Sequence, residues 1–298
     1  MKKITFKPLL LASTAALISL NFQSCTKEPE DDLGGGGGGT AGYTKSDDIA
    51  PSNLVAKFSF ENSLTDAKSN ITEETSTGIT YAAGAKGFAY QGATDAYALY
   101  SNITPAISSL QSFTVATWVK TNNHTDGAES WFQVLNDSNW IGNLFLLQES
   151  GAETTDSVRV KFTFNKWDAP AWKEQWVDLN GDNRLVIGNN EWHHMTASYD
   201  AVSSKFTVYI DGKLKEVSED VSNRFGDDPA NGGGPLGPLQ FKGATRFVFG
   251  CFNNHLPGNS PDAWMKHFDG GLDEFRIYNK ALSSSDVESL YDLEKQGK

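Results

Sequence analysis

The chain has 298 residues, of which 37 are acidic and 25 are basic, and its formal net charge at pH 7 is −12. So acidic a chain is a poor partner for nucleic acid, whose phosphates attract lysine and arginine, and for an anionic lipid surface. Two cysteines in the whole sequence exclude a disulfide framework.

The first residues predict an export signal. Three lysines precede an apolar stretch over residues 9–20, which is too short to cross a bilayer as a helix and fits the core of a signal peptide. Ser24 and Cys25 follow, and this order resembles a bacterial lipoprotein signal. Phe22 stands where the commonest version has leucine, which the looser motif of the Bacteroides group tolerates. The resemblance implies that residues 1–24 are removed and that Cys25 is lipidated.

Residues 25–52 are interpreted as a tether. The acidic run "TKEPEDD" after Cys25 resembles the signal that sends Bacteroides-type lipoproteins to the outer face of the outer membrane. Gly34–Gly39 have no side chains to bury and lose much backbone entropy on ordering, so they predict a flexible spacer. We therefore expect a lipid-anchored protein of the outer membrane that faces the extracellular side. The alternative is a secreted protein with a stray cysteine and a low-complexity linker.

Residues 53–298 predict one all-β domain with a single short helix at its end. Apolar residues alternate with polar ones in short runs that are separated by Gly, Asn, Asp and Ser. The helix is predicted from Ser283, as N-cap, to Leu293. An Asp-Gly pair at 211–212 predicts a hairpin turn. Strands are predicted over residues 54–60, 112–120, 158–164, 205–213, 245–250 and 272–279.

Short strands of this kind predict a sandwich of two sheets. Three connections, residues 121–130, 166–181 and 219–243, are longer than tight turns require. Long loops on a rigid sandwich are where binding sites usually lie, so these segments are candidate binding regions.

Four motifs carry a resemblance to a known family. They are "FTVATWVK" at 113–120, "EWHHMTASYD" at 191–200, "FTVYIDGKL" at 206–214 and "GGLDEFRIYNKALSSSDVESLY" at 270–291. In order and spacing they resemble the laminin G-like, concanavalin A-like jelly-roll domain of bacterial surface proteins. The resemblance implies a curved antiparallel jelly-roll sandwich from about residue 54 to about residue 293.

These motifs are mainly structural. Trp118 and Trp192 are interpreted as packing residues. His193 and His194 are adjacent on a strand, so their side chains point to opposite faces and cannot easily share a metal ion. Cys251, beside an apolar strand, is interpreted as a small buried side chain. The histidines form no ligand-spaced cluster in the sequence; they are residues 124, 193, 194, 255 and 267.

The resemblance also implies a structural calcium ion against the convex face. Its ligands in such domains come from a turn after the first strand and from an aspartate near the last, which here match Asp66 and Asp273, with Glu61 or Asn62 nearby. The alternative is that Asp66 caps a turn and Asp273 pairs with Arg276 or a neighbour. No organic cofactor is indicated.

Catalysis is not predicted. The glucanases of the same superfamily carry Glu-x-Asp-x-Glu on one strand, which sets two carboxylates at a glycosidic bond. This sequence lacks that motif, as well as His-Glu-x-x-His and Gly-x-Ser-x-Gly. Because catalytic carboxylates can also be far apart in sequence, a glycoside hydrolase stays an alternative.

Tryptophans supply the candidate ligand contacts. Five of the eight fall between residues 131 and 176, and one more precedes the last strand, mostly among polar residues. An indole face can stack on the C–H face of a sugar ring while neighbouring amides and carboxylates bind the hydroxyls. The alternative is that these rings pack under long loops. The candidates, with Trp167 and Trp172 foremost, are Trp131, Trp140, Trp167, Trp172, Trp176 and Trp264.

Together these features predict a non-catalytic surface lipoprotein that binds a glycan or glycoconjugate for a nutrient-uptake system. Its expected partners are the outer membrane, through the lipid, and a TonB-dependent outer-membrane transporter with its lid lipoprotein. The alternative is an accessory subunit of such a transporter complex that binds protein or peptide, since aromatic loops also serve protein interfaces.

Overall fold

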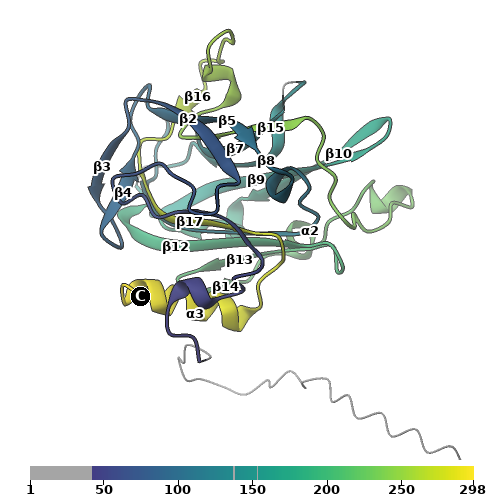
Figure 1. The fold of residues 1–298 in the computed structure, drawn as a ribbon. Helices are drawn as coiled ribbons and strands as arrows, with labels where there is room; N and C mark the ends of the chain where they lie inside the picture. Colours follow the sequence, from purple (N-terminus) through teal and green to yellow (C-terminus); the bar gives the residue numbers. More distant parts are fainter. Residues whose placement is uncertain (1–41, 137, 153) are drawn as a thin grey trace, which may run out of the picture. The chain divides into compact units, whose positions relative to one another are not determined.

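The computed structural model describes residues 42–136, 138–152 and 154–298 (Figure 1). The predicted signal peptide, Cys25 and the glycine run at 34–39 lie outside the described residues. Within the described ranges, no helix is long and apolar enough to cross a membrane.

Strands dominate the described chain, as the alternating pattern predicts. The strands are β1 (Leu54–Phe58), β2 (Ile71–Thr77), β3 (Thr80–Ala83), β4 (Phe88–Gln91), β5 (Tyr97–Ile103), β6 (Phe113–Asn122), β7 (Ala128–Asn136), β8 (Asn139–Glu149), β9 (Ser157–Asp168), β10 (Ala171–Leu179), β11 (Leu185–Val186), β12 (Asn189–Asp200), β13 (Lys205–Ile210), β14 (Lys213–Lys215), β15 (Ala244–Phe249), β16 (Met265–His267) and β17 (Gly271–Tyr278). The helices are η1 (Ser46–Asp48), α1 (Pro105–Ser108), η2 (Gly181–Asn183), α2 (Glu219–Ser222), η3 (Pro229–Asn231), η4 (Asn253–His255) and α3 (Ser284–Lys295).

The described strands form two sheets that pack face to face. The first has eight strands in the order β14-β13-β12-β6-β17-β4-β3, with β1 beside β17. The second has nine, in the order β10-β9-β8-β7-β15-β5-β2, with β11 on β9 and β16 on β7. Pairing is antiparallel except between β16 and β7. This arrangement confirms the predicted sandwich and is consistent with a jelly roll.

The core lies between the sheets and is rich in aromatic rings. In β9, Val158, Val160, Phe162 and Phe164 are all buried on the inner face, as their period-two spacing predicts. Phenylalanines from both sheets meet edge to face, which is the favoured geometry for aromatic pairs. One such group consists of Phe58, Phe132, Phe247, Phe249 and Phe275.

Helix α3 covers the outer face of the eight-stranded sheet, which we call the covered sheet (Figure 1). The Oγ of Ser283 accepts a hydrogen bond from the backbone N–H of Asp286 at 3.1 Å, which confirms the predicted N-cap. Val287 and Leu290 are buried against the sheet. We call the nine-stranded sheet the open sheet, because no helix of this length within the described ranges covers its outer face.

The packed domain begins before residue 53. Ile49 is fully buried against α3, and the hydroxyl of Tyr43 donates to Asp286 at 2.9 Å. Asp47 accepts a hydrogen bond from the buried guanidinium of Arg276 at 2.6 Å. Residues 43–50 of the expected tether are therefore held on the domain by apolar and ionic contacts that act between distant parts of the chain.

Two of the three predicted long connections are shorter than expected. Residues 166–181 are mostly strand, because β9 and β10 form one long hairpin in which Trp172 pairs with Trp167. Its buried positions alternate at 175, 177 and 179, a pattern that the surrounding charged residues obscure in the sequence. Segment 121–130 shrinks to residues 123–127. Only residues 219–243 form the expected long connection.

Candidate functional site

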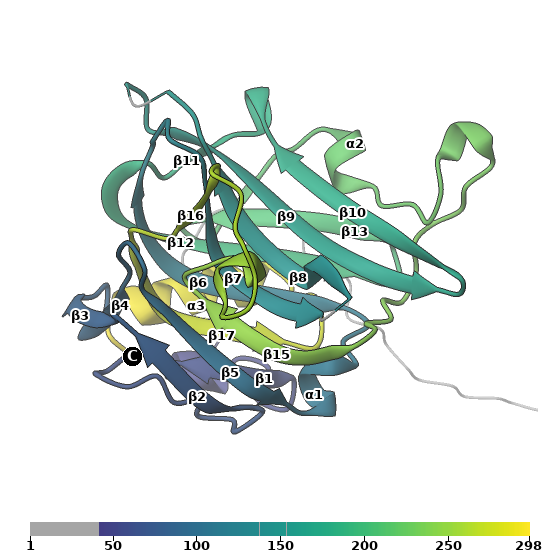
Figure 2. The same ribbon diagram turned by 90° about the horizontal axis from the view of Figure 1, so that it is seen from above.

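A cavity of about 310 Å³ on the outer face of the open sheet is the candidate functional site. Three of its lining residues are tryptophans that come from different parts of the chain: Trp140 from β8, Trp176 from β10 and Trp264 from the segment before β16. Figure 2 looks onto this sheet, with the segment that leads to β16 lying over β7 and β8. We call this cavity the tryptophan pocket.

The three indole rings surround the pocket without filling it. Trp140 lies with its ring centroid 6.4 Å from that of Trp176 and 6.1 Å from that of Trp264. The planes of Trp140 and Trp264 meet at 74°, so the rings form walls at an angle to each other. The three side chains are 37–42% exposed. Half-exposed rings of this size are costly in water and available to an apolar ligand surface.

Backbone contacts with Gly127 and Ala128, where β7 begins, fix the position of Trp264. The N–H of Ala128 donates to the Trp264 carbonyl at 2.7 Å. Gly127 has a φ of +138°, and a Cβ there would lie 2.3 Å from the same carbonyl. Glycine is therefore required at 127 for the segment to approach this closely. The parallel pairing of β16 with β7 starts at the next residue, Met265.

A bulge in β8 presents Trp140. The pairing register of β7 with β8 shifts between residues 134 and 136 of β7. On the β8 side of this bulge, Gly142 has a φ of +74°. A Cβ on Gly142 would lie 2.4 Å from the carbonyl of Val134, so this bulge also needs glycine. The amide of Gln133 donates to the Trp140 carbonyl at 2.5 Å and accepts from the N–H of Asn253 at 3.0 Å. One buried side chain thus links the bulge to the segment that carries Trp264.

An ion pair completes the pocket. Lys161 of β9 and Glu149 of β8 are hydrogen-bonded to each other, and the Lys161 ammonium lies 5.8 Å from the ring centroid of Trp176. Both side chains occupy outward-facing positions of their strands. The period-two alternation of the strands could therefore have identified them from the sequence. Below them Leu147 and Ala128 form an apolar floor. The pocket therefore joins apolar walls to one donor and one acceptor group.

The remaining predicted tryptophans do not belong to this pocket. Trp131 is fully buried and packs against Phe268 at a centroid distance of 5.5 Å, so its interpretation as an exposed ring is wrong. It sits on an inward position of β7 inside the core. Trp167 and Trp172 stack edge to face across the β9–β10 hairpin, and the ammonium of Lys242 lies 3.3 Å from the Trp167 ring centroid. One face of Trp167 is therefore already occupied.

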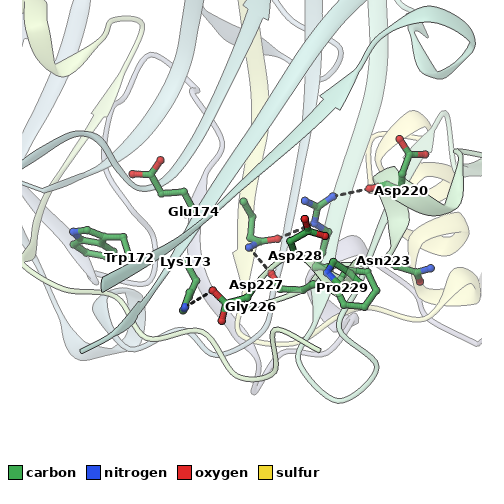
Figure 3. Close-up of a pocket in the computed structure, with 12 residues that line it drawn as sticks. Trp172, Lys173, Glu174, Asp220, Asn223, Gly226, Asp227, Asp228 and Pro229 are labelled. Atoms are coloured by element: carbon green, nitrogen blue, oxygen red, sulfur yellow. Dashed lines mark hydrogen bonds and ion pairs between the residues drawn. The ribbon is translucent and has the colours of Figure 1, made fainter. Parts of the chain in front are cut away.

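Trp172 lines a second cavity of about 520 Å³, between β10 and the 219–234 connection (Figure 3). Lys173 reaches across it to Asp227 at 2.6 Å. Arg224 donates to the side chain of Gln175 at 3.0 Å and to backbone carbonyls of α2. Because Lys173 and Arg224 are already held by neighbouring groups of the lining and the cavity has a single indole ring, it is a weaker candidate site.

The structure separates the predicted calcium ligands. The carboxylate of Asp66 accepts hydrogen bonds from four backbone N–H groups at 2.8–3.0 Å, those of residues 57, 68, 70 and 71. This side chain therefore caps a turn, which was the alternative interpretation. The Asn62 side chain is exposed.

Glu61 and Asp273 flank one turn, between β3 and β4. Glu61 accepts from the N–H of Phe88 at 3.1 Å, and Asp273 accepts from the N–H of Lys86 at 2.9 Å. Burial raises the pKa of Asp273 to about 8, with nearby Glu274 acting in the same direction. A buried carboxylate beside a second carboxylate and a glycine-rich turn fits the oxygen ligands of Ca²⁺. The proposed pairing of Asp273 with Arg276 is not found among the described contacts; Arg276 instead contacts Glu274, Glu294 and Asp47.

The tryptophan and histidine residues of the motifs in β6 and β12 are structural, as predicted. Trp118 is 6% exposed, stacks on Tyr291 and donates its indole N–H to Glu294 at 2.9 Å. His194 is fully buried under α3, whereas His193 points to the other side and contacts Asp211 at 2.9 Å. The ring of Trp192 packs over Gly271.

Sequence reasoning missed a third cavity, of about 470 Å³, which adjoins β16. It brings together His255, His267 and Glu129, and burial raises the pKa of Glu129 to about 7. These residues are far apart in the sequence and meet only because β16 pairs with β7. No spacing rule could have grouped them.

Comparison with known proteins agrees with this architecture. Residues 91–248 match the family model described as the concanavalin A-like lectin/glucanases superfamily. No curated protein sequence matches the chain. Among solved structures, domain 4 of AbnA, an extracellular GH43 arabinanase from Geobacillus stearothermophilus determined with arabinotriose, is 24% identical, with a TM-score of 0.52 over 80% of this chain and 98% of that chain.

The binding domains of botulinum neurotoxins are also similar in fold. The serotype D ligand-binding domain, determined with N-acetylneuraminic acid, has a TM-score of 0.54 at 15% identity, over 83% of this chain and 52% of that chain. The serotype G binding domain has a TM-score of 0.53 at 14% identity, over 81% and 51%. The chain thus matches about half of each toxin chain, and at these identities the likeness shows the fold.

Proposed function

Since this chain belongs to the concanavalin A-like lectin/glucanases superfamily, we propose that it is a non-catalytic carbohydrate-binding protein whose site is the tryptophan pocket. One observation carries the proposal: three half-exposed indole rings converge on a single cavity. The solved structures of similar fold include one with arabinotriose and one with N-acetylneuraminic acid, which supports a sugar as the ligand class.

The pocket has the chemistry that a sugar requires. The axial C–H groups of a pyranose or furanose form an apolar face that can stack on an indole ring, and two rings at a steep angle can contact two faces of one sugar unit. Lys161 offers a hydrogen-bond donor and Glu149 an acceptor for hydroxyl groups. At about 310 Å³ the cavity is at the small end of ligand sites, so it suits one end or a short stretch of a glycan.

The same geometry favours binding over hydrolysis. Glycosidases need two carboxyl groups flanking the scissile bond. Glu149 is the single carboxylate among the described residues that line the tryptophan pocket, and it is bound to Lys161. A proton donor and a base are therefore not paired across this cavity.

From the signal peptide predicted at residues 1–24 and the tether predicted at residues 25–52, we propose that a lipid on Cys25 anchors the protein to the outer membrane. There it would deliver glycan to a TonB-dependent transporter. A Cys25→Ser variant is expected to lose incorporation of radiolabelled palmitate and to leave the membrane fraction, whereas Cys251→Ser is expected to keep both. Retention of label by Cys25→Ser would refute the anchor.

We also propose a calcium ion away from this pocket, as a structural element. Glu61 and Asp273 would hold it at the turn between β3 and β4, where it would neutralise two carboxylates and fasten the turn to β17. Asp66 would take no part, because its oxygens are occupied by backbone N–H groups.

The test is binding of the protein to an array of polysaccharides and oligosaccharides, followed by calorimetry with the best ligand. The proposal expects micromolar binding to one glycan class that Trp176→Ala and Trp264→Ala each weaken strongly. Trp172→Ala is the matched control, because its ring lies on a different cavity. A folded protein that binds no glycan, or one that loses binding only in Trp172→Ala, would disprove the assignment.

A further inference from the structure

We propose that Cys251, His255 and His267 form a site for Zn²⁺ at the base of the segment between β15 and β17. One ligand atom from each side chain, the sulfur and two ring nitrogens, lies within 4.8 Å of the others. The two imidazole rings are themselves close, with centroids 4.1 Å apart. This cluster corrects the expectation from the sequence that the histidines group nowhere.

The fold itself brings these residues together. Cys251 follows β15, His255 ends η4 and His267 ends β16. The N–H of Phe268 donates to the carbonyl of Gly250 at 2.9 Å, which closes the segment and sets residues 251 and 267 beside each other. Gly250 has a φ of +84°, so the chain can turn sharply at this point.

The surroundings of the two imidazole rings favour a metal ion. The ring of His255 lies beside the backbone of Met265. Its Nδ1 is buried and has no partner within the described part of the chain. A buried nitrogen without a partner is costly, and the neutral imidazole is the form that binds a metal ion. The Nδ1 of His267 lies 4.0 Å from the carboxylate of Asp95, which is longer than a hydrogen bond but lets the negative charge favour a bound cation.

The donor set selects the metal. One thiolate and two imidazoles suit Zn²⁺, which is held at about 2.0–2.3 Å by such ligands, and they do not suit Ca²⁺ or Mg²⁺, which take oxygen. Binding would draw the three side chains somewhat closer than in the metal-free arrangement. Zinc prefers four ligands, and His255 and His267 both line the cavity of about 470 Å³. Water or a small anion from this cavity can take the fourth position, and the same opening lets the ion enter.

The site is separate from the other two. Glu61 and Asp273 lie at the turn between β3 and β4, and the tryptophan pocket lies on the other side of the 251–264 segment. The alternative is a buried thiol that merely packs next to two adjacent imidazole rings tilted by 43°, and this alternative predicts no affinity for zinc. The two interpretations therefore differ in a direct binding measurement.

The experiment uses the full chain without a histidine tag, carrying Cys25→Ser so that Cys251 is its single thiol. Equilibrium dialysis with Zn²⁺ is expected to give one ion per chain. Replacement by Co²⁺ is expected to give a thiolate-to-cobalt charge-transfer absorption band. Excess Ca²⁺ should displace neither ion.

Cys251→Ser is expected to abolish the charge-transfer band and to weaken zinc binding at least tenfold. His255→Gln and His267→Gln are expected to weaken zinc binding similarly, and they carry the test if Cys251→Ser fails to fold. His193→Gln, which removes a histidine from a distant strand, is the matched control and should bind zinc normally. Absence of zinc from the folded wild-type chain, or unchanged binding in the cluster variants, would overturn the proposal.

Discussion

The outer faces of both sheets carry tryptophans, which are buried on the covered sheet and partly exposed on the open sheet. Under α3, Trp118 and His194 are buried and their polar atoms face charged partners. On the open sheet, Trp140 and Trp176 stand half exposed around a cavity. The residue type does not distinguish a packing tryptophan from a binding one. What distinguishes them is whether another element of the chain covers the face.

In this comparison of the two outer faces, the largest expected effect comes from replacing Arg276, which is fully buried on the covered sheet. Its guanidinium contacts Glu294 at 2.7 Å and Glu274 at 2.8 Å. Arg276→Ala would leave the buried Glu294 without its cation, while Glu274 would keep Lys86 at 3.6 Å and Lys57 at 3.9 Å, so we expect the free energy of unfolding to fall by about 3–5 kcal/mol. Urea denaturation measures this. Arg159→Ala, which breaks an exposed pair with Asp178, is the control and should cost about 1 kcal/mol or less. Equal losses of unfolding free energy in the two variants would contradict the expected difference between a buried and a partly exposed ion pair.

The next largest effect is a dependence of stability on pH that arises at His194. Burial lowers its pKa to about 3, while in the unfolded chain the value is about 6.5. Below pH 6.5 the unfolded state therefore binds a proton that folded His194 does not, and stability falls as the pH decreases towards 3. The charged groups that face this ring are Glu294, Asp211 and Arg276.

His194→Gln should therefore flatten the dependence. Between pH 6.5 and 4.5 the expected difference in unfolding free energy amounts to about 2–3 kcal/mol, measured by urea denaturation at several pH values. His193→Gln, on the opposite side of the same strand, should keep the wild-type slope. If both variants behave alike, burial under α3 is not the cause.

On the open sheet the expected effect is on binding. Trp176→Ala removes one wall of the tryptophan pocket, and we expect it to weaken glycan affinity by about 10- to 100-fold, or about 1.4–2.8 kcal/mol. The free energy of unfolding should fall by less than for a fully buried tryptophan, because Trp176 is 37% exposed. Calorimetry and urea denaturation on the same samples separate the two quantities. If Trp176→Ala loses stability but keeps its glycan affinity, Trp176 is a packing residue and not a ligand contact.

The smallest expected effect concerns calcium. Free Ca²⁺ at ten times its dissociation constant should raise the unfolding free energy by about 1.4 kcal/mol over a chelator control. Asp273→Asn should abolish the response, and Asp66→Asn should keep it despite a lower baseline. Thermal unfolding with and without chelator makes the measurement. Loss of the response in Asp66→Asn alone would restore the ligand set expected from the sequence.

Much of the fold could be predicted from the sequence, because strand alternation and caps are local signals. The 158–164 strand, the Asp-Gly turn at 211–212 and the Ser283 cap all lie where the pattern places them. The long β9–β10 hairpin was missed because charged residues interrupt its outward face. The turn-capping role of Asp66 was kept open, since a carboxylate in a turn can bind either N–H groups or a cation.

The site was less accessible to sequence reasoning. Composition pointed to tryptophans, but Trp131 occupies an inward strand position and Trp167 lies beneath a lysine. Trp140, Trp176 and Trp264 meet through sheet pairing between segments up to 124 residues apart along the chain. Such pairing depends on the whole topology, and no window of sequence contains it.

The two ends of the described chain lie together on the covered sheet. Ser46 donates through its N–H at 3.4 Å and through its hydroxyl at 2.9 Å to the carbonyl of Lys298, beside α3 (Figure 1). The tryptophan pocket lies on the outer face of the other sheet. Immobilising the domain on a sensor chip or bead by either end therefore leaves the pocket turned towards the solution. One end of the chain can therefore carry a label while the other end is attached to a surface. Both modifications then lie on the covered sheet, away from the tryptophan pocket.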